Sequence, residues 1–286
     1  SQKFKVLEHD LYVEGFFRSF KKILNSKVVV FWFINYKTLP ILLFSKLLNK
    51  KICIISGGYD ISNINGYGMF STVYGAVNQK IQLFFSDLIM VNSKSSYLEI
   101  LERFTNIKNK LFWVYHALDN IPFKLNKNYR NIDFITIGTV KKVNMRRKGL
   151  STFIEFAKKY PQKVFYLIGP VIDKDLLKLF PPNIKITGFI SEDKKNELLE
   201  NSKYYIQDSE HEGFGLSVLE AQFYGCHILF NPVYALNETV LYGTSLHDNF
   251  IFDENFKTQN NIKKLDSTFS LLKRKHALDS LINLEI

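Results

Sequence analysis

The stretch that decides the fold is EGFGLSVLEA, residues 212–221, which stands between two strand-like runs, KYYIQDS at 203–209 and HILF at 227–230. Leu216 and Leu219 lie three positions apart, the spacing of one helical face, so the second half of the stretch predicts a helix. A strand, a glycine-bracketed turn, a helix and another strand form the repeating unit of a parallel α/β sheet. The stretch therefore predicts a doubly wound α/β fold.

The turn itself predicts a binding site for an anion. The first backbone N–H groups of the helix, near Gly215, Leu216 and Ser217, have no partner within the helix, and with the helix dipole they attract phosphate. Gly213 and Gly215 allow a ligand to approach the backbone closely.

Two carboxylates, Glu212 and Glu220, flank this turn. If the segment is mostly helical, the positions between them span about 12 Å, so one carboxylate serves each side of a bound diphosphate. A ligand with hydroxyls at both ends and a diphosphate between them has the shape of a nucleotide-sugar.

Length and composition indicate a globular protein of two domains. The 286 residues, 46% of them hydrophobic, are enough for two α/β domains with separate cores. Cys53 and Cys226 lack the spacing of a disulfide framework or a zinc site, which favours reduced thiols. No signal peptide opens the sequence, and Lys37 and Pro40 interrupt the most apolar region, 28–44. We therefore expect a cytoplasmic protein.

The net charge of +11 implies an attraction to anions. The sequence carries no RNP-like aromatic motif, zinc finger or isolated recognition helix, so we expect no nucleic-acid partner. The run GFFRSFKKIL at 15–24 predicts an amphipathic helix with a basic face. Its pattern favours a helix packed on a sheet, and it leaves open a peripheral contact with the inner face of an anionic membrane.

Strand-like and helical runs alternate along both halves of the chain. We expect an N-terminal Rossmann-like domain on the acceptor side at 1–120, a linker at 121–131, and a C-terminal Rossmann-like domain that binds a nucleotide-sugar at 132–286. The segment KKVNMRRKG at 141–149 predicts a basic loop. The helical pattern after Ile262 is expected to end in a helix that packs back on the N-terminal domain. Two similar halves predict a ligand cleft between them.

An ordered set of motifs is similar to the retaining glycosyltransferases of the GT-B type, family 4, which are named for an E-x7-E motif. The resemblance implies two Rossmann-like domains whose parallel sheets face each other across a cleft. The motifs that carry it are DLIMVNSKSS at 87–96, YHALD at 115–119, ITIGTVKKVNMRRKGLSTFIEFA at 135–157, ITGFIS at 186–191 and YIQDSEHEGFGLSVLEAQFYG at 205–225.

The resemblance implies a role for each residue of the turn. Glu220 would bind the ribose hydroxyls of the donor, next to the first helical residues, Leu216 and Ser217. The hydroxyls of the transferred sugar would be held by Glu212 and by the backbone of the next three residues, Gly213, Phe214 and Gly215.

The diphosphate would contact Lys148, so that Lys148 and Glu212 are the expected catalytic pair. Members of the family usually carry an arginine where this chain has Thr139. The charge could come instead from Lys141, Lys142, Arg146 or Arg147, and Arg147 is the expected replacement because it adjoins Lys148. The resemblance implies that neither a metal nor another cofactor is required, and the sequence shows no Asp-x-Asp or histidine cluster with metal-ligand spacing.

The N-terminal half departs further from the family. Many members have a histidine near the donor sugar where this chain has Gly57, whereas Asp60 of the same motif is retained and is expected to contact the donor. The run at 27–34 begins earlier than in the family, so the N-terminal domain is expected to be abbreviated.

The combined interpretation is a retaining glycosyltransferase that moves a sugar from a nucleotide-diphosphate sugar to a glycan, a lipid or another acceptor. One alternative is a subunit that binds nucleotide-sugars but is inactive or depends on a partner. Another is a sugar-nucleotide epimerase or a phosphorylase on the same architecture.

Overall fold

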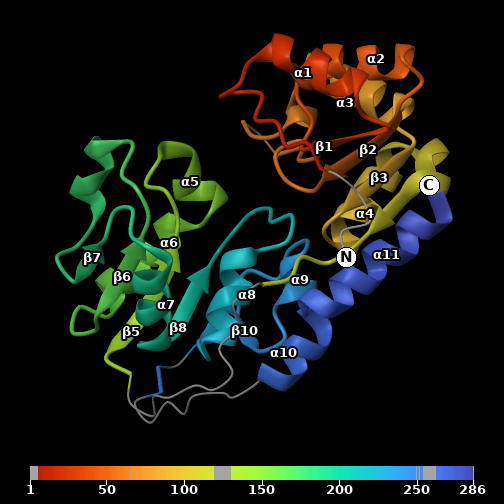
Figure 1. Cartoon of the computed structure of the whole chain (residues 1–286). Helices are drawn as coiled ribbons and strands as arrows, with labels where there is room; N and C mark the ends of the chain where they lie inside the picture. The colour runs from red at the N-terminus through yellow and green to blue at the C-terminus, as the bar shows by residue number, and fades with distance from the viewer. Residues whose placement is uncertain are drawn as a thin grey trace. The chain divides into compact units, whose positions relative to one another are not determined.

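The computed structural model describes two compact units. One comprises residues 1–92 and 96–113, and the other residues 93–95 and 114–286; we refer to them as the first and second unit. Each contains its own parallel sheet (Figure 1). The residues whose structure is described are 6–64, 66–118, 130–248, 250, 252–253 and 262–285.

The first unit is built on four parallel strands in the order β1-β2-β3-β4, with helices in the connections. The helix expected at 15–24 and the alternation of strands and helices expected after it are both present. Its elements are α1 (Phe16–Leu24), β1 (Val28–Trp32), α2 (Thr38–Leu47), β2 (Lys51–Ser56), η1 (Met69–Ser71), α3 (Val73–Phe85), β3 (Leu88–Val91), α4 (Lys94–Arg103), η2 (Thr105–Lys110) and β4 (Leu111–Trp113).

Helix α1 packs against the core of the first unit, which confirms the interpretation favoured by its pattern. Ile23 is buried in that core, Phe16 packs against it, and the Phe20 ring meets the Phe44 ring of α2 with centroids 4.6 Å apart. The other face of α1 remains apolar in part, because the side chains of Phe17 and Leu24 are 87% and 57% exposed.

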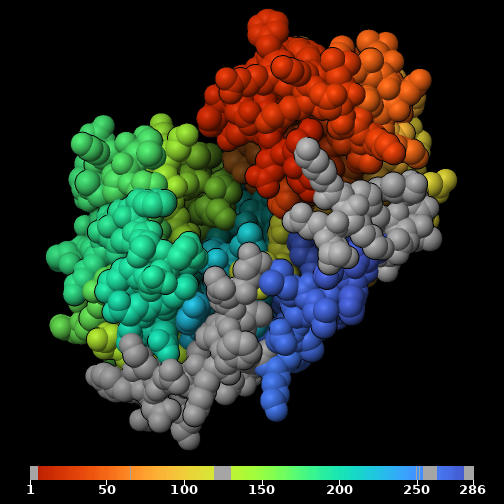
Figure 2. All heavy atoms as spheres, viewed as in Figure 1, coloured from red at the N-terminus to blue at the C-terminus, as the bar shows by residue number. Residues whose placement is uncertain are grey.

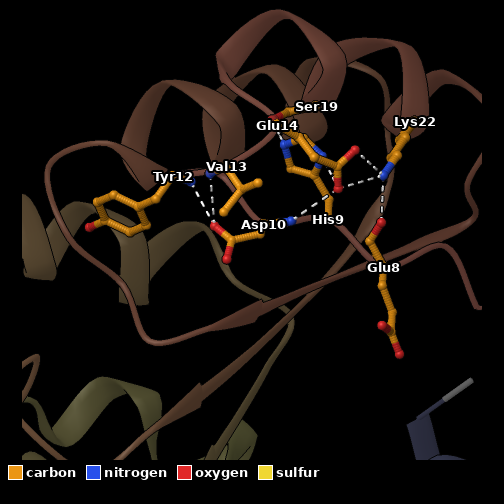
Figure 3. Close-up of polar contacts among 8 residues, drawn as sticks. All are labelled: Glu8, His9, Asp10, Tyr12, Val13, Glu14, Ser19 and Lys22. Atoms are coloured by element: carbon orange, nitrogen blue, oxygen red, sulfur yellow. Dashed lines mark hydrogen bonds and ion pairs between the residues drawn. The ribbon is translucent and has the colours of Figure 1, made fainter.

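The segment before α1 is tied to that helix by polar contacts (Figure 3). Lys22 Nζ donates to Glu14 Oε2 at 2.8 Å, and His9 Nε2 lies 2.8 Å from Ser19 Oγ. Asp10 Oδ1 accepts from the backbone N–H of Tyr12 at 2.8 Å. Ser19 contacts His9, and His9 contacts Glu14, which is the order of side chains in a catalytic triad. Ser19 is buried, however, so we interpret these contacts as holding the segment against α1 and not as an active site.

The second unit contains a six-stranded parallel sheet in the order β10-β9-β8-β5-β6-β7. Its elements are β5 (Ile132–Ile137), α5 (Lys142–Arg147), α6 (Leu150–Lys159), β6 (Phe165–Ile168), η3 (Lys174–Leu179), β7 (Ile184–Ile186), α7 (Glu192–Glu200), β8 (Ser202–Gln207), α8 (Leu216–Phe223), β9 (His227–Phe230), α9 (Leu236–Thr239), β10 (Gly243–Ser245), α10 (Ile262–Phe269) and α11 (Leu271–Glu285). The doubly wound α/β prediction is confirmed.

The predicted basic loop at 141–149 is wrong, because most of it forms helix α5. Asn144 organises this short helix: its Nδ2 donates to the carbonyl of Thr139 at 2.9 Å, and its Oδ1 accepts from Arg147 Nη2 at 2.8 Å. Asp173 Oδ2 accepts from the backbone N–H of Lys142 at 2.7 Å. The contact with Asp173 comes from a residue distant in sequence, and spacing within the segment does not reveal it.

The described residues include only part of the region where the sequence predicts the domain boundary. Strand β5 begins at Ile132, the first residue of the expected C-terminal domain, whereas most of the expected linker at 121–131 lies outside the described residues. The packing of the last helix on the N-terminal domain and the abbreviation of that domain stay predictions.

Helices α10 and α11 belong to the second unit, and α10 packs against α8. Phe269 at the end of α10 lies in one cluster with Phe214 and Phe223. From α11, Arg274 Nη1 donates to the carbonyl of Tyr115 and lies 2.9 Å from His116 Nδ1. Burial, together with the Arg274 guanidinium, lowers the pKa of His116 to about 4.

The stability of the second unit should therefore fall in mild acid. Below the ordinary histidine pKa of 6.5, only the unfolded chain takes up a proton at His116, and this continues until the pH reaches about 4. For a fully buried group this loss is at most about 2 kcal/mol between pH 7 and pH 5. In His116→Asn, whose amide oxygen still accepts from Arg274, urea unfolding should show a smaller loss over that range. An equal loss in both proteins would contradict this account.

Gly149 determines how α5 and α6 join. Its φ of +70° is left-handed, and a Cβ there would lie 2.3 Å from the Asp208 carbonyl oxygen, whereas a Cβ on the equally left-handed Gly188 would meet nothing within 4 Å. We expect Gly149→Ala to cost about 3 kcal/mol of unfolding free energy, from backbone strain plus steric overlap, and Gly188→Ala about 1 kcal/mol from strain alone. Equal losses in the two variants by urea denaturation would show that the overlap is relieved.

Candidate functional site

The candidate site forms where the strand order of the second unit reverses. Strand β5 lies between β6 and β8, so the connection leaving β5 and the connection leaving β8 run to opposite sides. Open α/β sheets bind ligands at such a switch point, beyond the carboxyl ends of the strands. Lys148 follows the first of these strands and Glu212 the second.

Lys148 is held at the junction of α5 and α6. It caps the C-terminal end of α5 and is followed by Gly149, whose left-handed conformation lets α6 begin in a new direction. The backbone N–H of Glu210 donates to the carbonyl of Arg147 at 3.1 Å, which joins this junction to the loop after β8. This backbone bond positions the two loops before any side chain is considered.

Lys148 and Glu212 form an ion pair, with Nζ 2.5 Å from Oε2. The two side chains are largely enclosed, at 20% and 15% exposed. Ser209 Oγ adds a weaker contact to the same carboxylate oxygen at 3.3 Å. Burial favours the neutral acid, but the charge and hydrogen bond of Lys148, with the charge of Arg147, outweigh it and keep the pKa of Glu212 below its usual range. Glu212 is therefore ionised at neutral pH.

Helix α8 begins at this ion pair, as the sequence predicts. Gly215 precedes it with φ +86°, and its missing Cβ would lie 3.4 Å from Glu212 Cγ. Phe214 is buried in the cluster with Phe269, which anchors the turn, and Leu216 is partly exposed. The N-terminus of α8 and the Glu212 carboxylate thus lie next to each other.

Tyr205 is a residue of this region that the sequence reasoning missed. It is fully buried on β8, and its hydroxyl accepts from the backbone N–H of Ile137, at the end of β5, at 3.3 Å. It also bonds to the side chain of Ser217, in the first turn of α8. Its hydroxyl therefore connects the end of β5 to the start of α8. An aromatic residue in a buried strand gives no sequence signal for this role.

The second motif carboxylate, Glu220, is paired with a lysine from a different element. Lys195 Nζ, from α7, lies 2.9 Å from Glu220 Oε2 and 2.7 Å from Glu192 Oε2. Burial raises the pKa of Glu220, and Lys195 opposes that rise. Lys195 was not among the residues expected at the site.

Arg147 and Thr139 both form hydrogen bonds with the side chain of Asn144. Arg147 Nε and Nη2 both donate to Asn144 Oδ1, and the Thr139 carbonyl accepts from the other end of the same amide. The Arg147 charge reaches Glu212, since it contributes to the low pKa of that group. Replacement of the missing arginine by Arg147 stays a prediction.

Asp60 lies in the first unit and is buried in its own loop. Its Oδ1 accepts from the backbone N–H of Gly58 at 3.0 Å, and its Oδ2 accepts from Ser56 Oγ. Burial raises the pKa of this carboxyl. These contacts brace the glycine-rich loop, and a contact of Asp60 with a donor stays a prediction.

The described residues offer neither a metal cluster nor a membrane span. Within those ranges, no group of three or more histidine, cysteine, aspartate or glutamate side chains is arranged to hold a metal ion. None of the helices in the described part of the chain is long and apolar enough to cross a membrane. Independence from metals stays a prediction.

Comparison with solved structures identifies the architecture. HepE (Alr3699) of Anabaena, solved with UDP and glucose, superposes with a TM-score of 0.71 at 14% identity, over 93% of this chain and 80% of that chain. The sucrose-phosphate synthase of Thermosynechococcus elongatus gives 0.68 at 13% identity, over 96% and 77%. TarM of S. aureus gives 0.64 at 18% identity, over 96% of this chain but only 56% of that chain. At these identities the similarity shows the fold, which is GT-B.

Comparison of sequences identifies the family. No curated protein sequence matches the chain. Residues 119–279, more than half of the 286, match the model of the family Glycosyl transferases group 1. This range contains the Lys148–Glu212 pair, Glu220 and the whole of the switch point. The chain therefore belongs to the glycosyl transferases group 1 family and has the GT-B fold.

Proposed function

We propose that the chain is a retaining, metal-independent glycosyltransferase of the family 4 type, which moves a hexose-like sugar from a nucleotide-diphosphate sugar to a glycan, lipid-linked or other acceptor. The observation that carries the proposal is the enclosed Lys148–Glu212 pair at the start of α8. A cation and an anion thus lie together at the switch point, beside the N-terminus of α8, whose first N–H groups have no partner within the helix.

These groups match the parts of a bound donor. The diphosphate would lie against Lys148 and the N-terminus of α8, where cationic and dipolar groups attract phosphate. Glu212 would accept hydrogen bonds from the sugar hydroxyls, and Glu220 from the ribose hydroxyls. In this arrangement the ligand separates Lys148 from Glu212, and each finds a new partner on the ligand.

The chemical step breaks the bond between the anomeric carbon and the oxygen of the diphosphate. The acceptor oxygen forms the new bond on the same face, and its proton passes to the departing phosphate oxygen. Negative charge grows on the diphosphate during this step, so Lys148 stabilises the transition state more than the bound donor. A cation held in place before the reaction provides this stabilisation without a metal ion.

The first test removes the cation. Lys148→Met should lower the rate of donor turnover by about a hundredfold or more, the usual effect of losing a group that stabilises developing charge. Slow release of nucleoside diphosphate from a panel of nucleotide-sugars measures the rate. Lys158→Met, at an exposed lysine of α6 outside the basic segment 141–149, is the matched control and should be nearly unchanged.

Three outcomes separate the hypotheses. Turnover in the wild type that is lost in the Lys148 variant supports the transferase. Binding of donors without turnover, even when cell-extract acceptors are added, favours the partner-dependent subunit. An unchanged rate in Lys148→Met would refute the assignment of the leaving-group contact.

We also propose that the outer face of α1 contacts an anionic bilayer. Phe17, Lys21 and Leu24 are spaced at one helical face and are all exposed, and Arg18 is exposed beside them. Lys22 is turned instead toward Glu14 (Figure 3). Residues near the N-terminus form the red part of the first unit's surface in Figure 2. An apolar and basic face of this kind suits the headgroup region of a bilayer with negative charge.

Vesicle sedimentation tests this contact. At low salt the protein should sediment with vesicles of phosphatidylcholine and phosphatidylglycerol more than with phosphatidylcholine alone, and less as salt is added. The double variant Phe17→Ser, Lys21→Glu should lose most of that binding. Leu98→Ser, at an exposed leucine of α4, is the control and should keep it. Equal sedimentation of the two variants would place the contact elsewhere.

A further inference from the structure

Lys195 occupies an unusual position for a lysine. Its side chain on α7 is only 13% exposed, between Glu192, which is 81% exposed, and Glu220, which is 22% exposed. An exposed ion pair contributes little, so the contact with the enclosed Glu220 is the stronger of the two. The adjacent Lys194 shows the ordinary alternative, since it is half exposed and pairs with Glu197 on the surface.

Burying a lysine against a carboxylate is costly, because both groups lose their hydration. Apolar residues would hold α7 against α8 at lower cost. Lys195 contacts Glu220, and the proposed function assigns Glu220 to the nucleoside end of the donor. The lysine therefore acts on a residue of the site and not on an arbitrary surface group.

We propose that Lys195 is a positioning residue of the donor site, which keeps Glu220 charged and oriented so that it accepts hydrogen bonds from the hydroxyls of the nucleoside. This inference rests on the proposed function. Lys195 contacts Glu220 and not the reacting atoms, so its effect should appear in the affinity for nucleosides and not in the contact with the diphosphate.

The groups around Glu220 explain why the lysine is needed. Lys195 of α7 contacts it, and Glu192 of α7, Tyr205 of β8 and Tyr224 at the end of α8 lie near enough to interact with its charge. Among these four, Lys195 alone is a cation. Burial and the negative charge of Glu192 both favour the protonated form of Glu220. A protonated carboxyl has less capacity to accept two hydrogen bonds from a ribose.

The consequence is a dependence on pH. The pKa of Glu220 is raised by burial while Lys195 holds it down, so removal of Lys195 should raise this pKa further. In Lys195→Met the nucleoside affinity should then fall as the pH is lowered toward 6 and recover toward pH 8, whereas in the wild type the fall should begin at lower pH. A purely structural role for Lys195 would not move this profile.

The experiment is a double-mutant cycle measured by calorimetry. The probes are UDP, GDP and ADP, with inorganic pyrophosphate as the ligand that lacks a nucleoside. Lys195→Met should weaken the best-bound nucleoside diphosphate about tenfold or more at pH 6, as expected for loss of a charge-assisted contact, and pyrophosphate much less. In a Glu220→Gln background the same substitution should have little further effect, because its target is absent.

Two control variants complete the design. Lys195→Arg should retain most of the affinity, and Lys194→Met, on the same helix, should leave it unchanged. Circular dichroism at each pH verifies that the variants are folded.

Each outcome has a distinct meaning. If Lys195→Met weakens binding equally in the wild-type and Glu220→Gln backgrounds, Lys195 contacts the ligand itself and the positioning role is overturned. A loss that is the same at every pH also overturns it. If the wild type binds none of the three nucleoside diphosphates, the proposed function fails, and this inference fails with it.

Discussion

The ion pair between Lys148 and Glu212 is the interaction on which the site depends. Its two members come from connections that leave neighbouring strands, β5 and β8, in opposite directions. Only a sheet whose order reverses between these strands brings the two connections together. The left-handed Gly149 and Gly215 then direct each connection so that the charges meet at the start of α8. The strand order thus creates the site, and the glycines complete its geometry.

A pair enclosed to this degree contributes little to stability, because the cost of removing both charges from water offsets their attraction. Its value is preorganisation: an anion and a cation are held, partly dehydrated, before a ligand arrives. Under the proposed function, a diphosphate would then replace the carboxylate beside Lys148, and sugar hydroxyls would replace the ammonium beside Glu212. Electrostatic contacts are stronger in such an enclosed site than in water. The exchange of partners limits the net cost of desolvation on binding.

The sequence predicted most helices and strands, and the turn before α8, because they follow local rules, whereas the roles of Lys148, Glu212 and Glu220 came from the resemblance and stay predictions. Helical spacing, apolar strands and glycines at turns are visible within a few residues. The contacts it missed join distant segments: Asn144 and Asp173 convert an expected loop into α5, and Tyr205 links β5 to α8. Lys195 escaped notice because a lysine in a charged helix such as EDKKNELLE ordinarily faces solvent. Which lysine of such a helix is buried is decided by packing against α8.

The two motif carboxylates, although they share one short segment, differ in their electrostatic surroundings. Glu212 meets Lys148 and the charge of Arg147, and these outweigh its burial, so its pKa is lowered. Glu220 meets Lys195, whose charge is shared with Glu192, and burial prevails, so its pKa is raised. The motif spacing does not distinguish the two glutamates. Their surroundings shift their pKa values in opposite directions. The carboxylate at the proposed sugar end is held ionised by two cations, whereas the one at the proposed nucleoside end has a single buried lysine to oppose its protonation.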